Sequence, residues 1–375
     1  KTGSPHPKIN IDSFSIRWTG QIIPPKSGKY QLKLKSDDGI RLFIDGEKLY
    51  DDWTRHAPEL VVLEKNLEAG RAYDITLEYF EGVYGAMVQF GWEYKDNKVT
   101  DNIRQAVKLA SDADLAIVCV GTNKELEGEA MDKMSLNLPG KQNLLIQEVI
   151  KANPSTIVVV YGATPVDISG WINDVPVLLQ AWFPGQEGGN ALADIIFGDF
   201  NPSGKLAFSY INDENQSPPL MQYQKHPLNV NYNEGIFLGY RYLDQKGIEP
   251  QFPFGFGLSY TDFMLSDLTI KQKDNKSIVS IRIKNIGQKA GQQVIQVYIS
   301  DRLSSLPRPE KELKAFEKVY LESGETKEVH MQLDDMAFSF YDPERHHWVL
   351  EPGEFIISAG FSSREILLTK SIEKK

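Results

Sequence analysis

The sequence is poor in cysteine, in long apolar runs and in clustered positive charge, and each shortage excludes a class of protein. Its 375 residues include a single cysteine, Cys119, so a disulfide within the chain is impossible. Because Cys119 lies inside an apolar run, we predict that it is a small, buried hydrophobic residue. No apolar run approaches the roughly 20 residues of a membrane-spanning helix. The number of cysteines does not indicate the cellular compartment of the protein.

The balance of charge disfavours two kinds of partner. The net charge is −10 and the sequence pI is near 5.3, with no cluster of lysine or arginine interleaved with aromatic residues. Nucleic acid and anionic membranes are therefore not expected partners. The chain starts with neither an initiator methionine nor the apolar segment of a signal peptide, so we expect a processed protein or part of a longer one.

Motifs for nucleotide and metal cofactors fail on their spacing. Gly198–Lys205 resembles a phosphate loop, but it has one residue too many between its glycines and is followed by Leu206 where Ser or Thr would bind magnesium. Gly185–Gly189 lacks the dinucleotide fingerprint, and the six histidines show no metal-ligand spacing. The sequence therefore predicts no cofactor and no metal, and a turn at Gly198–Lys205.

The chain has three regions that differ in their pattern of apolar and polar residues. Residues 1–95 contain short segments that alternate apolar with polar residues, which predicts an antiparallel β-sandwich or barrel. Two Asp-Gly pairs, Asp38-Gly39 and Asp45-Gly46, predict two hairpin turns. Residues 96–264 alternate helices with buried strands, which predicts an open, largely parallel α/β sheet covered on both faces. Residues 265–375 return to strands at the spacing of a second β-sandwich.

In the α/β region, three helices and three strands can be placed. Helices are expected at 101–111, with Asp101 as its cap, at 140–152 and from near Gly188. Strands are expected at 115–120, 156–161 and 175–181. The first strand leads into a loop with four carboxylates in eight residues, and their mutual repulsion predicts that at least one pKa is raised toward the range of a general acid. Taken alone, this loop fits a solvated acidic surface better. The four residues are Glu125, Glu127, Glu129 and Asp132.

Five motifs around this loop together resemble the C-terminal α/β domain of glycoside hydrolase family 3. They occur in the order of the family, and each resembles it almost without internal gaps: Leu138–Gln142, Ala181–Asp194, Phe197–Leu206, Glu234–Tyr242 and Phe252–Tyr260. Residues 308–354 resemble the fibronectin type III-like domain that follows in many β-glucosidases of that family. The segment Ser36–Gly46 with Trp53 is similar to a protective-antigen-type sugar-binding domain, which one subgroup of these enzymes carries as an insertion.

The resemblance implies a retaining β-glucosidase mechanism that is divided between two parts of a protein. In the family an Asp on an N-terminal (β/α)₈ barrel attacks the sugar, and a Glu from the α/β domain serves as the general acid and base. That Glu matches Glu129, with Glu127 as second choice, and Asp132 would contact the sugar. Asp132-Lys133 and Ala130 depart from the usual Asp-Arg and Gly. No barrel precedes the first region, so the chain is expected to be the C-terminal portion of the enzyme and inactive alone.

The resemblance also implies partners. The substrate would be a β-linked oligosaccharide or aryl β-glucoside, the missing barrel would be the protein partner, and a homo-oligomer is possible. Phe80 and Tyr84, on a glycine-flanked hairpin, are predicted to wall the subsite for the leaving-group sugar. The alternative is a non-catalytic carbohydrate-binding or adhesion protein, since paired aspartates such as Asp37-Asp38 hold calcium in related adhesins; a plain turn is the favoured interpretation of that pair.

Overall fold

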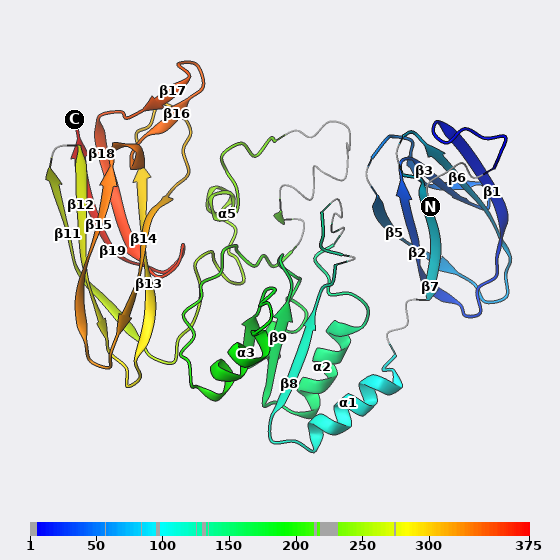
Figure 1. The fold of residues 1–375 in the computed structure, drawn as a ribbon, viewed down its shortest axis with the longest axis horizontal. Helices are drawn as coiled ribbons and strands as arrows, with labels where there is room; N and C mark the ends of the chain where they lie inside the picture. Colours follow the sequence, from blue (N-terminus) through cyan, green and yellow to red (C-terminus); the bar gives the residue numbers. More distant parts are fainter. Residues whose placement is uncertain are drawn as a thin grey trace. The chain divides into compact units, whose positions relative to one another are not determined.

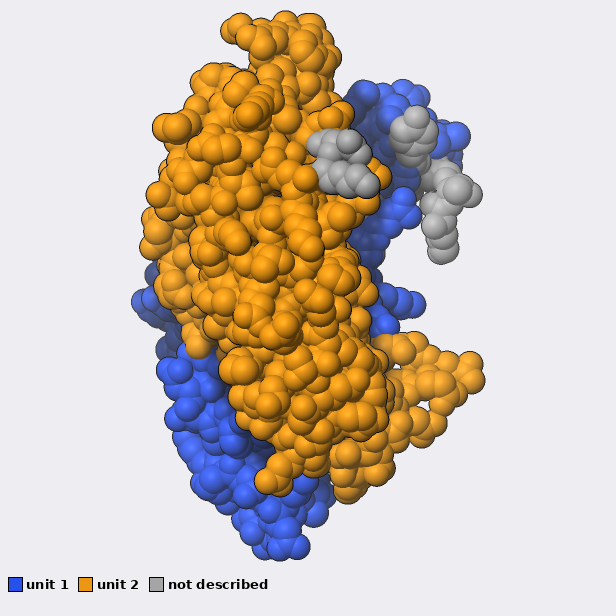
Figure 2. All heavy atoms as spheres, turned by 90° about the vertical axis from the view of Figure 1, so that its left-hand side faces the viewer, with its two compact units in different colours: residues 1–183, 218–231 blue, residues 184–217, 232–375 orange. Residues whose placement is uncertain are grey.

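The computed structural model divides the chain into two compact units, coloured separately in Figure 2. Unit 1 comprises residues 1–183 and 218–231, and unit 2 comprises residues 184–217 and 232–375. The residues that the structure describes are 6–56, 58–83, 85–94, 98–124, 126–129, 133, 135–213, 216–217, 232–273 and 275–375.

The first part of unit 1 is a sandwich of two antiparallel sheets, drawn in blue to cyan in Figure 1. One sheet has the order β1 (Phe14–Ile22), β6 (Tyr73–Glu81), β3 (Ile40–Ile44), β4 (Glu47–Asp52). The other has the order β5 (Glu59–Leu67), β2 (Gly28–Asp37), β7 (Met87–Tyr94). Every second residue of β2 and β3 is buried, as the period-2 pattern predicts, and both sheets contribute to one core. The β-sandwich prediction is confirmed.

Two of the three predicted hairpins are wrong. β6 and β7, the strands on either side of the glycine-flanked segment with Tyr84, belong to different sheets and do not pair. Asp45 and Gly46 both have positive φ, +49° and +78°, and they join the paired strands β3 and β4, as a tight hairpin turn requires. Asp38-Gly39 joins β2 to β3, which belong to different sheets and do not pair. The Asp38 carboxylate makes this crossing possible: it accepts hydrogen bonds from the backbone amides of His56 (3.1 Å) and Gly82 (2.5 Å).

The second part of unit 1 is a parallel sheet with helices. Along the chain come α1 (Asp101–Ser111), β8 (Ala116–Gly121), α2 (Gln142–Ala152), β9 (Thr156–Tyr161), a 3₁₀ turn (Ile172–Asp174) and β10 (Val177–Gln180). The sheet order is β10-β9-β8, and both pairs are parallel. The elements lie where the sequence predicts them. The cap of α1, however, is Thr100 and not Asp101, because the Thr100 hydroxyl accepts the hydrogen bond from the Ile103 amide (3.3 Å).

The prediction that this sheet is covered on both faces is wrong for β8. Val118 and Val120 are buried, whereas Ile117 is 46% exposed and Cys119 is also exposed. Successive residues of a strand point to opposite faces of the sheet. Helix α2 contacts β8 and β9, and a helix packed on a sheet covers one of its faces. An uninterrupted apolar run therefore does not show which of its residues are covered, and Cys119 is not the buried residue that we predicted.

In the part of unit 2 that the structure describes, there are two α-helices and a second β-sandwich. The helices are α3 (Gly188–Phe197) and α5 (Tyr240–Lys246). One sheet of the sandwich is β11 (Phe263–Lys273), β12 (Lys276–Asn285), β15 (Thr326–Asp334); the other is β14 (Glu312–Leu321), β13 (Gly291–Asp301), β18 (Gly353–Gly360), β19 (Ile366–Lys374). A short ribbon pairs β16 (Phe340–Asp342) with β17 (His347–Val349), and a 3₁₀ turn spans Asp335–Ala337. In the described part of the chain, no helix is long and apolar enough to cross a bilayer.

Two of the motifs that the sequence singled out bind each other within unit 2. Gly198 ends α3 with φ of +82°, and the irregular segment after it runs beside residues 252–260. The Asn201 side chain accepts hydrogen bonds from the Ser259 hydroxyl and the Tyr260 amide, and the Lys205 ammonium donates to the Gly257 carbonyl. The segment Gly198–Lys205, predicted as a turn, therefore connects to residues 252–260 through side-chain hydrogen bonds and does not form a nucleotide-binding loop.

Candidate active site

Two parallel strands place their following loops at one edge of the α/β sheet. β8 ends at Gly121 and β9 ends at Tyr161, and these two residues are partners in the strand register. Because the carboxyl ends of parallel strands meet at one edge, the loop after Gly121 and the loop after Tyr161 leave the sheet side by side. This edge is where an open α/β sheet presents functional side chains.

The end of β8 is held by Gln142, the first residue of α2. The Gln142 side chain accepts a hydrogen bond from the Gly121 amide (2.6 Å) and donates one to the Gly121 carbonyl (2.9 Å). Gly121 itself permits a close approach of the two strands: a Cβ at this position would lie 2.0 Å from the Tyr161 carbonyl oxygen. Gln142 and Gly121 therefore fix the point at which the acidic loop begins.

Glu127 anchors the acidic loop to the neighbouring loop. Its side chain is 5% exposed and accepts hydrogen bonds from the Ala163 amide (2.7 Å) and the Thr164 hydroxyl. The Lys133 ammonium lies 3.6 Å from the Glu127 carboxylate and donates to the Pro165 carbonyl (2.9 Å). Residues on both sides of Glu129 are thus tied to the loop that follows β9.

These contacts set the charge of Glu127. Burial alone would raise the pKa of its carboxyl, but the hydrogen bonds from Thr164 and Ala163 and the charge of Lys133 outweigh burial and lower it. Burial lowers the pKa of Lys133, and the Glu127 carboxylate opposes this shift. Glu127 is therefore an anionic anchor, and its pKa moves away from the value that a general acid at neutral pH needs.

Glu129 differs from Glu127 in its surroundings. It lies two residues further along the same turn and is exposed to solvent. Among the described residues, the contacts that hold Glu127 do not extend to Glu129. Of the other acidic residues that the sequence singled out, Glu125 and Asp132 lie outside the described residues, so the predicted sugar contact of Asp132 stays a prediction.

The aromatic residues predicted to wall a subsite are only partly described. Phe80 lies on β6, half-buried, with its ring centroid 5.0 Å from that of Trp53. A Cβ on Gly39 would lie 2.3 Å from the Phe80 ring, so Gly39 makes room for it. Tyr84 lies outside the described residues. Trp53 is 37% exposed and also packs against the Arg41 guanidinium, 4.1 Å from its ring centroid.

The Asp37-Asp38 pair is engaged in the fold. Asp38 is 4% exposed with φ of +68°, and both its carboxylate oxygens accept backbone hydrogen bonds, as described above. Burial and the neighbouring Asp38 charge raise the pKa of Asp37. The Asp38 carboxylate is thus occupied by the backbone of His56 and Gly82, and the turn interpretation of the pair stays a prediction.

Comparison with known proteins assigns most of this chain to one family. Residues 27–260 match the profile of the glycosyl hydrolase family 3 C-terminal domain, a span that includes the parallel sheet and the strands of the first sandwich from β2 to β7. The chain belongs to glycosyl hydrolase family 3. Residues 293–363 match the fibronectin type III-like domain, which confirms the predicted character of the second sandwich.

Relatives in the family are β-glucosidases. Thermostable β-glucosidase B of Acetivibrio thermocellus is 44% identical over 72% of this chain, and a β-glucosidase of Kluyveromyces marxianus is 36% identical over 98% of it. The crystal structure of the latter with glucose aligns with 97% of this chain at a TM-score of 0.71 and 35% identity, covering 45% of that structure. The matched regions are 36% and 46% of the two relatives' own lengths, so the chain spans about half of the curated relatives at most.

Sequence reasoning missed the contacts that two residues make at this edge of the sheet. The anchoring contacts of Glu127 were not predicted, and Gln142 was noted only as part of the Leu138–Gln142 motif. The signal for Gln142 was present, because it closes the Leu138–Gln142 motif on which the resemblance rests. Its contact with Gly121 crosses 21 residues, which no local pattern shows.

Proposed function

We propose that the chain is the C-terminal part of a retaining β-glucosidase and supplies its general acid and base, Glu129. The observation that carries this proposal is the contrast between two carboxylates on one loop: Glu127 is buried and hydrogen-bonded, and Glu129 is exposed two residues away. In the retaining mechanism the acid protonates the leaving oxygen and then activates water, while a second carboxylate attacks the sugar. That nucleophile would come from a barrel domain outside this sequence, and the substrate would be a β-linked oligosaccharide or aryl β-glucoside.

Glu129→Gln in the enzyme assembled with a barrel domain tests this assignment. Substrates with poor leaving groups should slow by about 10²- to 10⁴-fold, the usual contribution of general acid catalysis, because nothing protonates the departing oxygen. Activated aryl glucosides should slow much less, and azide should rescue the second step in Glu129→Ala. If Glu127→Gln gave this pattern and Glu129→Gln did not, the acid would be Glu127.

The proposal includes three domains: residues 1–95 as a protective-antigen-like insertion, 96–264 as the α/β domain and 265–375 as the fibronectin type III-like domain. The match of the family profile begins at residue 27, inside the first sandwich, which supports an insertion within the α/β domain. In this arrangement Phe80 and Tyr84 would form an outer wall of the subsite for the leaving-group sugar.

Replacing Tyr84 with Ala should raise the KM for disaccharides, because a stacking contact worth roughly 1 kcal/mol is lost. The KM for small aryl glucosides should stay nearly unchanged. Phe80→Ala is the companion variant, although its contact with Trp53 predicts a loss of stability as well. Steady-state kinetics on both substrate types decide the matter: equal effects on the two would remove the wall from the proposal.

A further inference from the structure

Three side chains of types that bind metal ions meet where the two sheets of the first sandwich join. Asp52 ends β4, His56 lies in the connection and Glu59 begins β5, so the three come from both sheets. One ligand atom from each lies within 4.8 Å of the others, and among the described residues this is the one such group of three. All three residues are half-buried. Their sequence positions, at intervals of four and three residues, match none of the spacings tested above.

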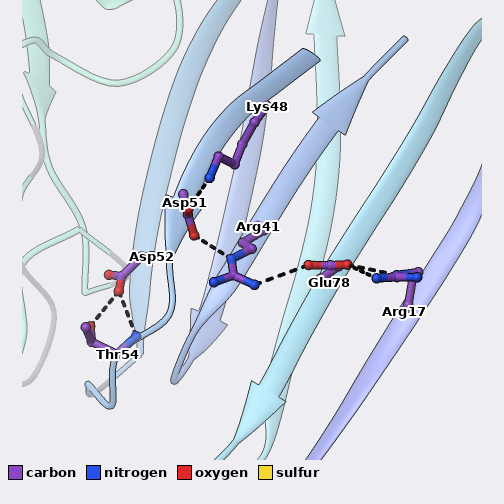
Figure 3. Close-up of polar contacts among 7 residues, drawn as sticks. All are labelled: Arg17, Arg41, Lys48, Asp51, Asp52, Thr54 and Glu78. Carbon is purple, nitrogen blue, oxygen red and sulfur yellow. Dashed lines mark hydrogen bonds and ion pairs between the residues drawn. The ribbon is translucent and has the colours of Figure 1, made fainter. Parts of the chain in front are cut away.

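The structure holds two of these groups in fixed positions. Asp38 binds the backbone of His56 at both ends: its side chain accepts from the His56 amide (3.1 Å) and its amide donates to the His56 carbonyl (3.1 Å). One oxygen of Asp52, Oδ1, accepts from the amide (2.9 Å) and the hydroxyl of Thr54 (2.5 Å), as Figure 3 shows. The second oxygen, Oδ2, is the one turned toward His56.

The spacing of the ligand atoms suits a shared ion better than a direct hydrogen bond. Asp52 Oδ2 and His56 Nε2 are 3.7 Å apart, beyond hydrogen-bond range. Two ligands that each lie about 2.0–2.2 Å from one zinc ion, at a roughly tetrahedral angle, are about 3.3–3.6 Å apart, close to the separation of these two atoms. The side chains of Asp52 and His56 are 10% and 11% exposed, so solvent does little to screen them.

Among the described residues, the cations nearest the end of β4 pair with Asp51 and not with Asp52. The next acidic residue, Asp51, points to the opposite face of β4 and pairs with Arg41 (2.5 Å) and Lys48, in a chain of charges that continues through Glu78 to Arg17 (Figure 3). Those cations therefore neutralise the charge of Asp51. They do not neutralise Asp52, whose side chain points to the other face of β4.

We propose that Asp52, His56 and Glu59 bind a divalent transition-metal ion, with zinc as the best fit. One imidazole nitrogen and two carboxylates form the three-ligand set of a zinc site whose fourth position is left to water or a further group. Calcium prefers six to eight oxygen ligands and fits this set poorly. Because Asp52 and Glu59 belong to different sheets, the ion would link the two sheets of the sandwich.

Zinc binding to the purified, chelator-stripped chain tests the proposal without any need for enzyme activity. Calorimetric titration should show one equivalent of zinc, with calcium giving no comparable signal. His56→Gln and Asp52→Asn should each weaken binding by at least about 100-fold, since even residues that only orient ligands are worth 10- to 100-fold. His330→Gln is the matched control: His330 lies 3.9 Å from Glu328, an exposed pair in the other sandwich, and this variant should bind as the parent does.

A measurement on the unmodified chain guards against variants that fail to fold. Zinc should shift the ring signals of His56 in a histidine NMR spectrum and leave those of His330 in place. An ordinary His-Asp ion pair would respond to pH and not to zinc. The site is refuted if the folded parent binds no zinc, if the His56 signals do not respond, or if a folded His56→Gln variant binds zinc normally.

Discussion

At the scale of single residues, the acidic loop shows how position decides what a carboxylate does. Glu127 and Glu129 are separated by one glycine, yet Glu127 is an anchor with two hydrogen bonds and an ion pair, and Glu129 is exposed. Composition and spacing treat them alike. Mutual repulsion among the acids predicted a raised pKa in the loop, and for Glu127 the contacts move the pKa the other way.

The lowered pKa of Glu127 predicts a pH-dependent loop. Its folded-state pKa lies below the ordinary 4.5, so the unfolded chain binds more protons near that pH, and stability rises with pH there. The anchor should therefore hold fully above pH 4.5 and be lost as the pH falls through the lowered value. Hydrogen-exchange protection of the Ala163 amide, which donates to Glu127, measures this directly.

Glu127→Ala supplies the comparison for that measurement. It should reduce Ala163 protection by about 1.5–3 kcal/mol at pH 7, the value of hydrogen bonds to a charged group, and remove its acid dependence. Glu129→Ala is the matched control, because an exposed side chain should leave Ala163 protected. Equal protection in Glu127→Ala and the parent would show that Glu127 is not an anchor.

At this scale, the sequence predicts features that depend on neighbouring residues and not those that depend on contacts between residues far apart in the chain. The fold-defining alternation of Leu32, Leu34, Leu42 and Ile44 is local, and it was predicted correctly. The exposure of Cys119 was not, because an apolar run shows neither which face of its strand is covered nor by what. The group of Asp52, His56 and Glu59 was invisible for a similar reason, since it forms only when two sheets meet.

At the scale of elements, pairing between strands is what local signals failed to give. Both Asp-Gly pairs carry the same hairpin signal, but only Asp45-Gly46 joins paired strands. At Asp38-Gly39 the long-range bonds to His56 and Gly82 decide the path of the chain. The parallel order of β8, β9 and β10 was predictable, because strands that alternate with helices must pair in parallel.

The close contact between β8 and β9 at their ends yields a prediction for Gly121. Gly121→Ala would place a methyl group 2.0 Å from the Tyr161 carbonyl oxygen, backbone that cannot move aside without separating the strands. We expect a loss of about 2–3 kcal/mol in the free energy of unfolding, typical of overpacking in a rigid site. Gly20→Ala is the control, since a Cβ there meets no atom within 4 Å. Chemical denaturation of both variants provides the test, and comparable stability would show that the strand ends yield readily.

At the scale of the whole molecule, the division of catalytic labour predicts what this chain does alone. The chain spans 46% of the Kluyveromyces marxianus relative, and the proposed nucleophile lies outside the matched part. A general acid contributes about 10²- to 10⁴-fold and cannot replace a nucleophile. The purified chain should therefore show no measurable hydrolysis of aryl β-glucosides, and co-expression with a barrel domain from a relative should restore turnover. A barrel whose attacking Asp is changed to Asn is the matched control, because it should associate equally well and restore nothing. Robust turnover by the chain alone would mean that both carboxylates of the mechanism lie within these 375 residues.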